Sequence, residues 1–238
     1  MKYDYIFILT YGRSGSTLLQ GILNSIEGVQ LRGENNGALF GLIRTYKATQ
    51  GAKHGFGKNS DQPSNPWYGA ADIRVDAFGK ALAKAFVEHV LRPDDGTRTT
   101  GFKEIRYYPP MLSDSAFEEC VFFMRHYFPK AALIVNTREI EAVVRSSKIA
   151  RHGVREESIR ASDARLRAFA ERGHRDVFHV HYDDYVHAPE RLESLFDFLG
   201  APFDVEQLKA VMGITHSTVA MPPRVSEQKL VTPGDIQK

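Results

Sequence analysis

The amino-acid sequence predicts an α/β fold, a single domain of residues 1–238 whose central parallel sheet has helices on both faces. Short apolar runs alternate with longer segments of helical spacing along most of the chain. The strongest run, residues 131–135, is apolar at every position, as strands buried on both faces are. No internal repeat or low-complexity tract is present. Because such folds bind ligands at the carboxyl ends of their strands, a site is expected there.

The first 70 residues are expected to hold one strand and two helices. Residues 5–9 are apolar and predict the first strand. Residues 16–26 carry apolar side chains on one helical stripe, and the apolar segment 38–46 indicates a second helix. Residues 51–69 contain four glycines and two prolines, which predicts a long mobile loop without regular structure.

The rest of the chain continues this alternation. Apolar spacing from Ile73 predicts a helix that ends near Pro93, and Gly200 is placed to end the last expected helix. Residues 217–238 contain three prolines, which suits either a tail that closes over a ligand or a disordered end. Between Pro93 and Gly200 the pattern predicts strands at 99–102, 131–135 and 177–181, and helices at 116–127, from Ile140 onward and at 192–199.

Composition excludes several classes of protein. The formal net charge is +2 with 25% charged residues, so no basic excess calls for a nucleic-acid partner. A single cysteine, Cys120, cannot form an internal disulfide, which fits a reducing compartment. The apolar run near the N-terminus is shorter than a signal sequence or a membrane span. We therefore expect a cytoplasmic protein without a membrane span, while composition does not predict its oligomeric state.

A loop of small polar residues follows the first strand. Residues 11–19 read Tyr-Gly-Arg-Ser-Gly-Ser-Thr-Leu-Leu and lead into the first helix. Free backbone N–H groups and the helix dipole converge at such a junction, which makes it an anion site. Nucleotide triphosphatases have Gly-Lys-Ser/Thr at this point, whereas this loop has no lysine and carries Arg13, whose fork suits anionic oxygens. The loop predicts a P-loop-NTPase-like domain, although an ordinary strand-to-helix turn is the alternative.

This loop resembles the 5′-phosphosulfate loop of sulfotransferases that use 3′-phosphoadenosine 5′-phosphosulfate (PAPS), where Arg-Ser-Gly-Ser/Thr-Thr-Leu is a common form. The resemblance implies that PAPS is the cofactor and that 3′-phosphoadenosine 5′-phosphate (PAP) is its product. It also implies which residues bind the 5′ end of the cofactor: Arg13, Ser14, Gly15, Ser16 and Thr17.

A second match follows the predicted strand at 131–135. In this family an arginine at the end of a strand and a serine eight residues later bind the 3′-phosphate, and Arg138 and Ser146 stand in that relation. A straight helix would separate their Cα atoms by about 12 Å, so we expect a loop to fold the interval. The alternative, if the resemblance is set aside, is that Arg138 pairs with a surface carboxylate and Ser146 lies on a helix surface.

A third match is His-Tyr-Asp at residues 181–183, which resembles tyrosylprotein sulfotransferases and implies that Tyr182 helps to hold the 3′ end of the cofactor. The resemblance, which also extends to bacterial carbohydrate and nodulation-factor-type sulfotransferases, covers residues 4–205 in scattered blocks. Residues 40–95 are unmatched. Because the Golgi members carry an N-terminal anchor that this sequence does not show, it implies a bacterial enzyme.

Sulfuryl transfer requires a base, a cation and a clamp on the donor. The resemblance implies that Glu34, in a Gly-Glu segment after the first helix, is the catalytic base, and that Lys103 and Arg13 supply positive charge. His54 and His152 are the alternatives for the base. Because cationic side chains and helix dipoles neutralise the transferred group, no metal is expected.

The acceptor is expected to be a hydroxyl of a carbohydrate or a related small molecule. Carbohydrate-sulfating relatives read closest to the Gly-Glu-Asn of residues 33–35. Trp67 and Tyr68 are candidates to fold over a sugar, although hydrophobic packing is an equal alternative.

Two other functions remain open from the sequence. One is a P-loop kinase or NTPase, in which Asp183 and Asp184 would form a Walker B element and magnesium would be required. The other is a non-catalytic nucleotide-binding protein, which would retain the phosphate-binding residues and dispense with Glu34 and Lys103.

Overall fold

The computed structural model describes residues 1–109, 111–149 and 155–213, and they form an α/β fold around one parallel sheet. The strand order is β2-β3-β1-β4-β5, so β1 is central. The chain first passes to the edge strand β2, returns to place β3 beside β1, and then adds β4 and β5 on the other side. The predicted fold class is confirmed. The strands are β1 (Tyr5–Leu9), β2 (Val29–Arg32), β3 (Thr99–Glu104), β4 (Ala131–Thr137) and β5 (Val177–His181).

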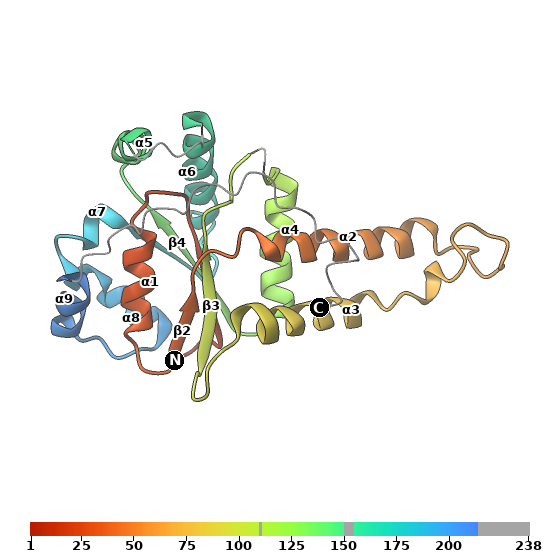
Figure 1. Ribbon diagram of the computed structural model, residues 1–238, viewed down its shortest axis with the longest axis horizontal. Helices are drawn as coiled ribbons and strands as arrows, with labels where there is room; N and C mark the ends of the chain where they lie inside the picture. Colours follow the sequence, from red (N-terminus) through yellow and green to blue (C-terminus); the bar gives the residue numbers. More distant parts are fainter. Residues whose placement is uncertain (110, 150–154, 214–238) are drawn as a thin grey trace, which may run out of the picture.

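Helices cover both faces of this sheet (Figure 1). Along β1 the side chains alternate, so Ile6 and Ile8 pack into one core and Phe7 and Leu9 into the other. The first core lies under α1 (Ser16–Asn24), α8 (Glu193–Leu199) and α9 (Val205–Gly213). The second lies under α2 (Ala38–Phe56), α3 (Val75–Phe86), α4 (Asp114–Tyr127) and α6 (Glu156–Ala170).

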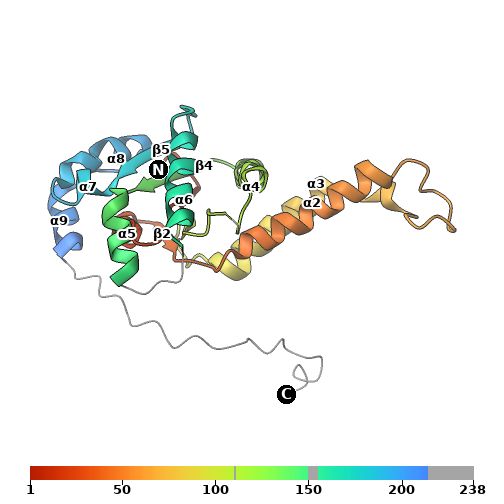
Figure 2. The ribbon, with the colours of Figure 1, turned by 90° about the horizontal axis from the view of Figure 1, so that it is seen from above.

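Helices α2 and α3 run side by side and project from the body as an arm, which Figure 2 shows from above. The prediction that residues 51–69 lack regular structure is wrong for 51–56, because α2 continues to Phe56. A glycine inside a helix costs about 1 kcal/mol without ending it. Packing against α3 and a hydrogen bond of 2.7 Å from Lys53 Nζ to the carbonyl of Ile73 support this extension.

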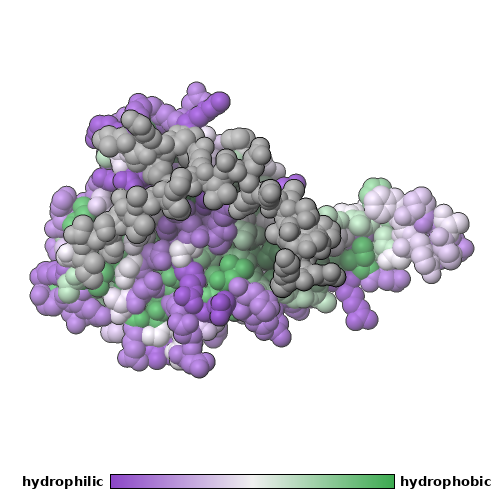
Figure 3. All heavy atoms as spheres, in the orientation of Figure 1, coloured by the Kyte–Doolittle hydropathy of each residue, from purple (hydrophilic) through white to green (hydrophobic). Residues whose placement is uncertain are grey.

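The outer end of the arm carries exposed aromatic side chains. The rings of Phe56 and Trp67 stack with their centroids 3.9 Å apart, and Tyr68 is exposed beside them in the chain. In Figure 3 the arm is pale with green patches, whereas the rim of the body is mostly hydrophilic. Trp67 therefore packs on the arm's own helix.

Several elements differ from the expectations or were not expected. Strand β4 includes Asn136 and Thr137, both fully buried, so it is two residues longer than its apolar run. Helices α6 and α9 had no counterpart in the prediction, and α3 passes into a π-helix, η2 (Val87–Leu91). His152 and the predicted tail at 217–238 lie outside the described residues. None of the described helices is long and apolar enough to span a membrane.

Candidate active site

The predicted site residues gather at one edge of the sheet, where the parallel strands end. β1 and its flanking strands β3 and β4 end side by side, because Leu9 aligns with Glu104 on one side and with Val135 on the other. The chain turns to opposite sides at β1, which is where α/β sheets open a ligand crevice. Each strand of the sheet leads into part of the predicted set: β1 into residues 13–17, β2 into Glu34, β3 into Lys103, β4 into Arg138 and β5 into Tyr182.

The loop after β1 is held in place by buried hydrogen bonds to the strands. Ser14 is fully buried, and its Oγ lies 2.6 Å from Thr10 Oγ1. Asn136 Nδ2 donates to the Ser14 carbonyl at 3.0 Å, while Asn136 Oδ1 accepts from the Tyr185 hydroxyl at 3.1 Å. These bonds tie the loop to β4. At its end Gly15 precedes α1 without providing a side-chain cap, so the first amides of the helix are left for a ligand.

Gly15 is required at this position for two reasons. Its φ of 77° is in the left-handed region, where residues with a Cβ are strained. A Cβ here would also overlap the ring of Tyr182. The structure thus brings Tyr182 directly against the anion-binding loop, although 167 residues separate them in the chain (182 − 15).

Arg13, Arg138 and Ser146 form one cluster. Arg13 Nε donates to Ser146 Oγ at 2.9 Å, and Arg138 Nη1 donates to the Arg13 carbonyl at 3.2 Å. The expected loop between Arg138 and Ser146 is wrong, because Ser146 lies on helix α5 (Ile140–Ile149). Arg13 closes the distance instead, since its long side chain reaches across from the β1 loop to α5.

The environment of Arg138 fits an anionic ligand. Its guanidinium carbon lies 4.6 Å from the centroid of the Tyr182 ring, and its Nε lies 3.8 Å from Asp183 Oδ1. That Nε is buried and has no hydrogen-bond acceptor in the described part of the chain. A buried donor without an acceptor is costly, so a phosphate oxygen at this point would complete the site.

Glu34 and Lys103 meet on the other side of the β1 loop. Lys103 Nζ donates to Glu34 Oε1 at 2.7 Å; the lysine side chain is 7% exposed and the glutamate side chain 34% exposed. Strands β3 and β4 are separated by β1 alone, which places Lys103 and Arg138 on strands about 10 Å apart. An acid and a cation therefore lie within reach of the arginine cluster.

Two residues beside this pair were not predicted from the sequence. Arg106 Nη1 lies 3.3 Å from Glu34 Oε2 and 2.8 Å from Glu104 Oε1. Glu104 is fully buried, and its carboxylate also accepts from the amides of Ile105 and Gly37, each at 2.8 Å. The signal was present in the sequence, because three charged residues, Lys103, Glu104 and Arg106, follow closely on the strand predicted at 99–102.

Tyr11 is a further residue that the sequence did not indicate. Its hydroxyl donates to Asp163 Oδ1 at 2.6 Å and accepts from the Arg138 amide at 3.0 Å. Burial, and next the hydrogen bond to Asp163, raise the pKa of Tyr11 well above its ordinary value. The neutral phenol therefore links the β1 loop to the end of β4 and to α6.

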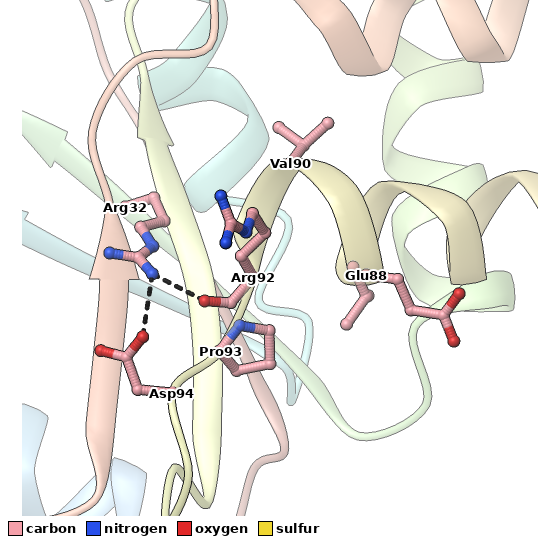
Figure 4. A pocket seen from close by; sticks show the side chains of 7 residues that line it. Arg32, Glu88, Val90, Arg92, Pro93 and Asp94 are labelled. Atoms are coloured by element: carbon pink, nitrogen blue, oxygen red, sulfur yellow. Dashed lines mark hydrogen bonds and ion pairs between the residues drawn. The ribbon is translucent and has the colours of Figure 1, made fainter.

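A cavity of about 580 Å³ lies beside the carboxyl end of β2 (Figure 4). Arg32 donates to the Arg92 carbonyl at 2.6 Å and pairs with Asp94 at 3.5 Å, whereas the Arg92 guanidinium has no ion-pair partner among the described residues. None of the predicted site residues lines the cavity, although Glu34 follows Arg32 by two positions. His54, an alternative base, lies in the last turn of α2, on the arm.

Comparison with known proteins identifies the class and then the family. The fold and its anion-binding loop are those of the P-loop type. The profile of the sulfotransferase family matches residues 5–205, and the chain belongs to this family. It is an enzyme of the PAPS-dependent sulfotransferase class and transfers a sulfuryl group.

Three of the similar solved structures are sulfotransferases, and the first of them has the same fold. The sulfotransferase domain of the Synechococcus PCC 7002 olefin synthase has a TM-score of 0.55 at 21% identity, covering 97% of this chain and 84% of that one. The sulfotransferase domain from the curacin biosynthetic pathway has a TM-score of 0.47 at 19% identity, covering 85% and 75%. Sulfotransferase STF1 from Mycobacterium tuberculosis H37Rv has a TM-score of 0.47 at 12% identity, covering 91% and 72%. No curated protein matches the sequence.

Proposed function

We propose that this enzyme transfers the sulfuryl group of PAPS to a hydroxyl of a carbohydrate or a related small polar acceptor. One observation carries the proposal: the buried Nε of Arg138 lacks an acceptor among the residues that the structure describes, in a cluster with Arg13 and Ser146 that adjoins the start of α1. The Lys103–Glu34 pair lies across β1 from this cluster. Both sets of residues lie along one sheet edge, which supports the assignment of one to the phosphates and the other to the transfer.

The 3′-phosphate is assigned to Arg138 and Ser146, with Tyr182 packed between that site and the β1 loop. The 5′ end is assigned to Arg13 and to the loop residues at the start of α1, where backbone amides point outward. When bound, PAPS supplies an activated sulfuryl group on its 5′-phosphate. The protein's part is to hold both ends and to neutralise charge on the leaving oxygen.

Glu34 is assigned as the base and Lys103 as the cation. Glu34 takes the proton from the acceptor hydroxyl while that oxygen forms its bond to sulfur. Lys103, nearly buried, neutralises the electron pair that stays on the phosphate oxygen when the sulfur–oxygen bond breaks. Glu34 then loses its proton to water, which restores the starting state.

The polar lining of the cavity beside β2 supports a hydrophilic acceptor. Of its seven lining residues, four are charged, and Arg92 has no ion-pair partner among the described residues. The cavity lies next to the segment that carries Glu34, so it could hold the part of the acceptor that does not react. A carbohydrate has the polar groups that such a lining can bind.

Calorimetry tests the donor assignment. We expect PAP to bind in moderate salt without magnesium, and with clear preference over ATP with magnesium. Arg138→Ala should abolish PAP binding, whereas the control Arg98→Ala, at an exposed ion pair with Glu27, should not change it. Equal affinity for ATP, or a requirement for magnesium, would reject the proposal and favour a kinase or NTPase. Labelled PAPS with a panel of sugars, phenols and peptides then identifies the acceptor.

A further inference from the structure

The base candidate is held by two cations, and they contact different oxygens. Lys103 Nζ lies 2.7 Å from Glu34 Oε1, and Arg106 Nη1 lies 3.3 Å from Glu34 Oε2. Glu34 is the least buried of the three side chains, with 34% of its surface exposed, against 23% for Arg106 and 7% for Lys103. The acceptor therefore approaches Glu34 from solvent, while both cations lie behind it.

The two cations have different freedom to move. Lys103 is an unbranched amine whose single described ion-pair partner is Glu34. Arg106 is fixed from the other side, because its Nη1 also lies 2.8 Å from Glu104 Oε1. Glu104 in turn is fully buried and accepts from the amides of Gly37 and Ile105. The Arg106 guanidinium, paired with a buried carboxylate that is itself fixed, would lose a buried ion pair if it moved away.

To neutralise charge on the leaving oxygen, Lys103 turns toward the donor, and its contact with Glu34 Oε1 is then lost. Glu34 would then have no contact to keep it in place, unless a second group holds its other oxygen. A base displaced by about 1 Å can lose about 100-fold in rate. Arg106 contacts the second oxygen and does not depend on Lys103.

We propose that Arg106 is a positioning residue, anchored by the buried carboxylate of Glu104, which keeps Glu34 oriented toward the acceptor when Lys103 turns to the donor. The inference rests on the assignment of Glu34 as the base. Glu104 acts on Glu34 indirectly, by holding Arg106 in place. Through the Gly37 amide it also fixes the start of α2, and so joins the segment that carries Glu34 to the strand that carries Lys103.

A double-mutant cycle tests whether Arg106 acts through Glu34. Arg106→Gln should lower kcat by about 10-fold with less than a twofold change in KM for PAPS. In a Glu34→Gln background the same substitution should cost less than twofold, because the group that Arg106 holds is no longer a base. Arg106→Lys, which keeps the charge, should recover part of kcat. Equal losses in both backgrounds would overturn the proposal, since they indicate a merely structural role.

Two crystal structures give a result that does not depend on activity. In a PAP complex of the wild-type enzyme, Arg106 is expected to remain on Glu34 while Lys103 has turned away. In the PAP complex of Arg106→Gln, where neither cation would hold it, Glu34 is expected to lose its single position, and the PAP complex of Arg98→Gln is the control. A Glu34 side chain unmoved in Arg106→Gln would overturn the inference. An oriented Glu34 in an enzyme that neither binds PAP nor transfers a sulfuryl group would instead reject the proposed function alone.

Discussion

Arg13 Nε donates a hydrogen bond of 2.9 Å to Ser146 Oγ, so a residue of the β1 loop is bonded to a residue of α5. The resemblance assigns these two residues to opposite ends of the donor. Their contact joins the proposed 5′ and 3′ binding groups into one connected surface. Under this assignment the two ends of the cofactor are not bound independently, and weakening one side should be felt at the other.

Ser146→Ala should weaken PAP binding by about 10-fold, because a hydrogen bond to a charged group contributes about 1.5–3 kcal/mol. Calorimetry with PAP measures the loss. Ser115→Ala, at an exposed serine on α4, provides the control and should leave PAP affinity unchanged. If Ser146→Ala binds PAP as well as the wild type, then Ser146 only orients Arg13 and does not contact the 3′-phosphate.

Gly15→Ala should abolish PAP binding and destabilise the protein by more than a backbone effect alone. Its φ of 77° costs any residue with a Cβ about 1–2 kcal/mol, and the Cβ also meets the Tyr182 ring. Gly173→Ala is the matched control, since its φ is 66° but a Cβ there has nothing within 4 Å. Urea denaturation compares the two variants. Equal losses of stability would contradict the packing of Tyr182 on the loop.

Glu34→Gln should leave PAP affinity nearly unchanged and lower turnover by roughly 100-fold or more, the range expected for loss of a general base. Single-turnover kinetics with labelled PAPS and an acceptor from the screen measure this. Glu27→Gln, whose carboxylate is 91% exposed at its ion pair with Arg98, is the control. Unchanged turnover would move the role of base to another residue, with His54 and His152 tested next.

Cys120 should resist thiol reagents in the folded protein. Its side chain is 1% exposed, and burial raises the pKa of the thiol to about 12, so almost none of it is thiolate at pH 8. Mass spectrometry after treatment with iodoacetamide should find no adduct in native protein and one in urea. Rapid labelling without urea would show that the core between α4 and the sheet opens readily.

Strands β1 and β4 were predictable, because strands buried on both faces are recognisable from local composition alone. Strands β3 and β5 were predicted as well, whereas β2 was missed. The residues at which the strands end were harder to predict. Asn136 belongs to β4 because its side chain bonds with Ser14 and Tyr185, which are distant in the sequence. Helix α6 was missed because, of its 15 residues, only Ile159, Leu166 and Phe169 are buried and apolar.

The candidate site was predicted residue by residue from the resemblance, and the structure places those residues at one sheet edge without testing their roles. What local patterns could not provide were the supporting contacts. Glu104 and Arg106 act on a segment almost 70 positions earlier in the chain, and Tyr11 bonds to Asp163 on a helix that was not expected. Such contacts depend on tertiary packing, which periodicity does not encode.

The arm has a consequence for how the enzyme can diversify. It begins four residues after Glu34, and the chain returns from it into β3, which carries Lys103, so the entire excursion is closed by a bond between those two side chains. The outer part of the arm can therefore be exchanged for another segment without changing the sheet. Such an exchange would change the surface near Glu34 and Lys103 and leave the proposed donor-binding residues unchanged.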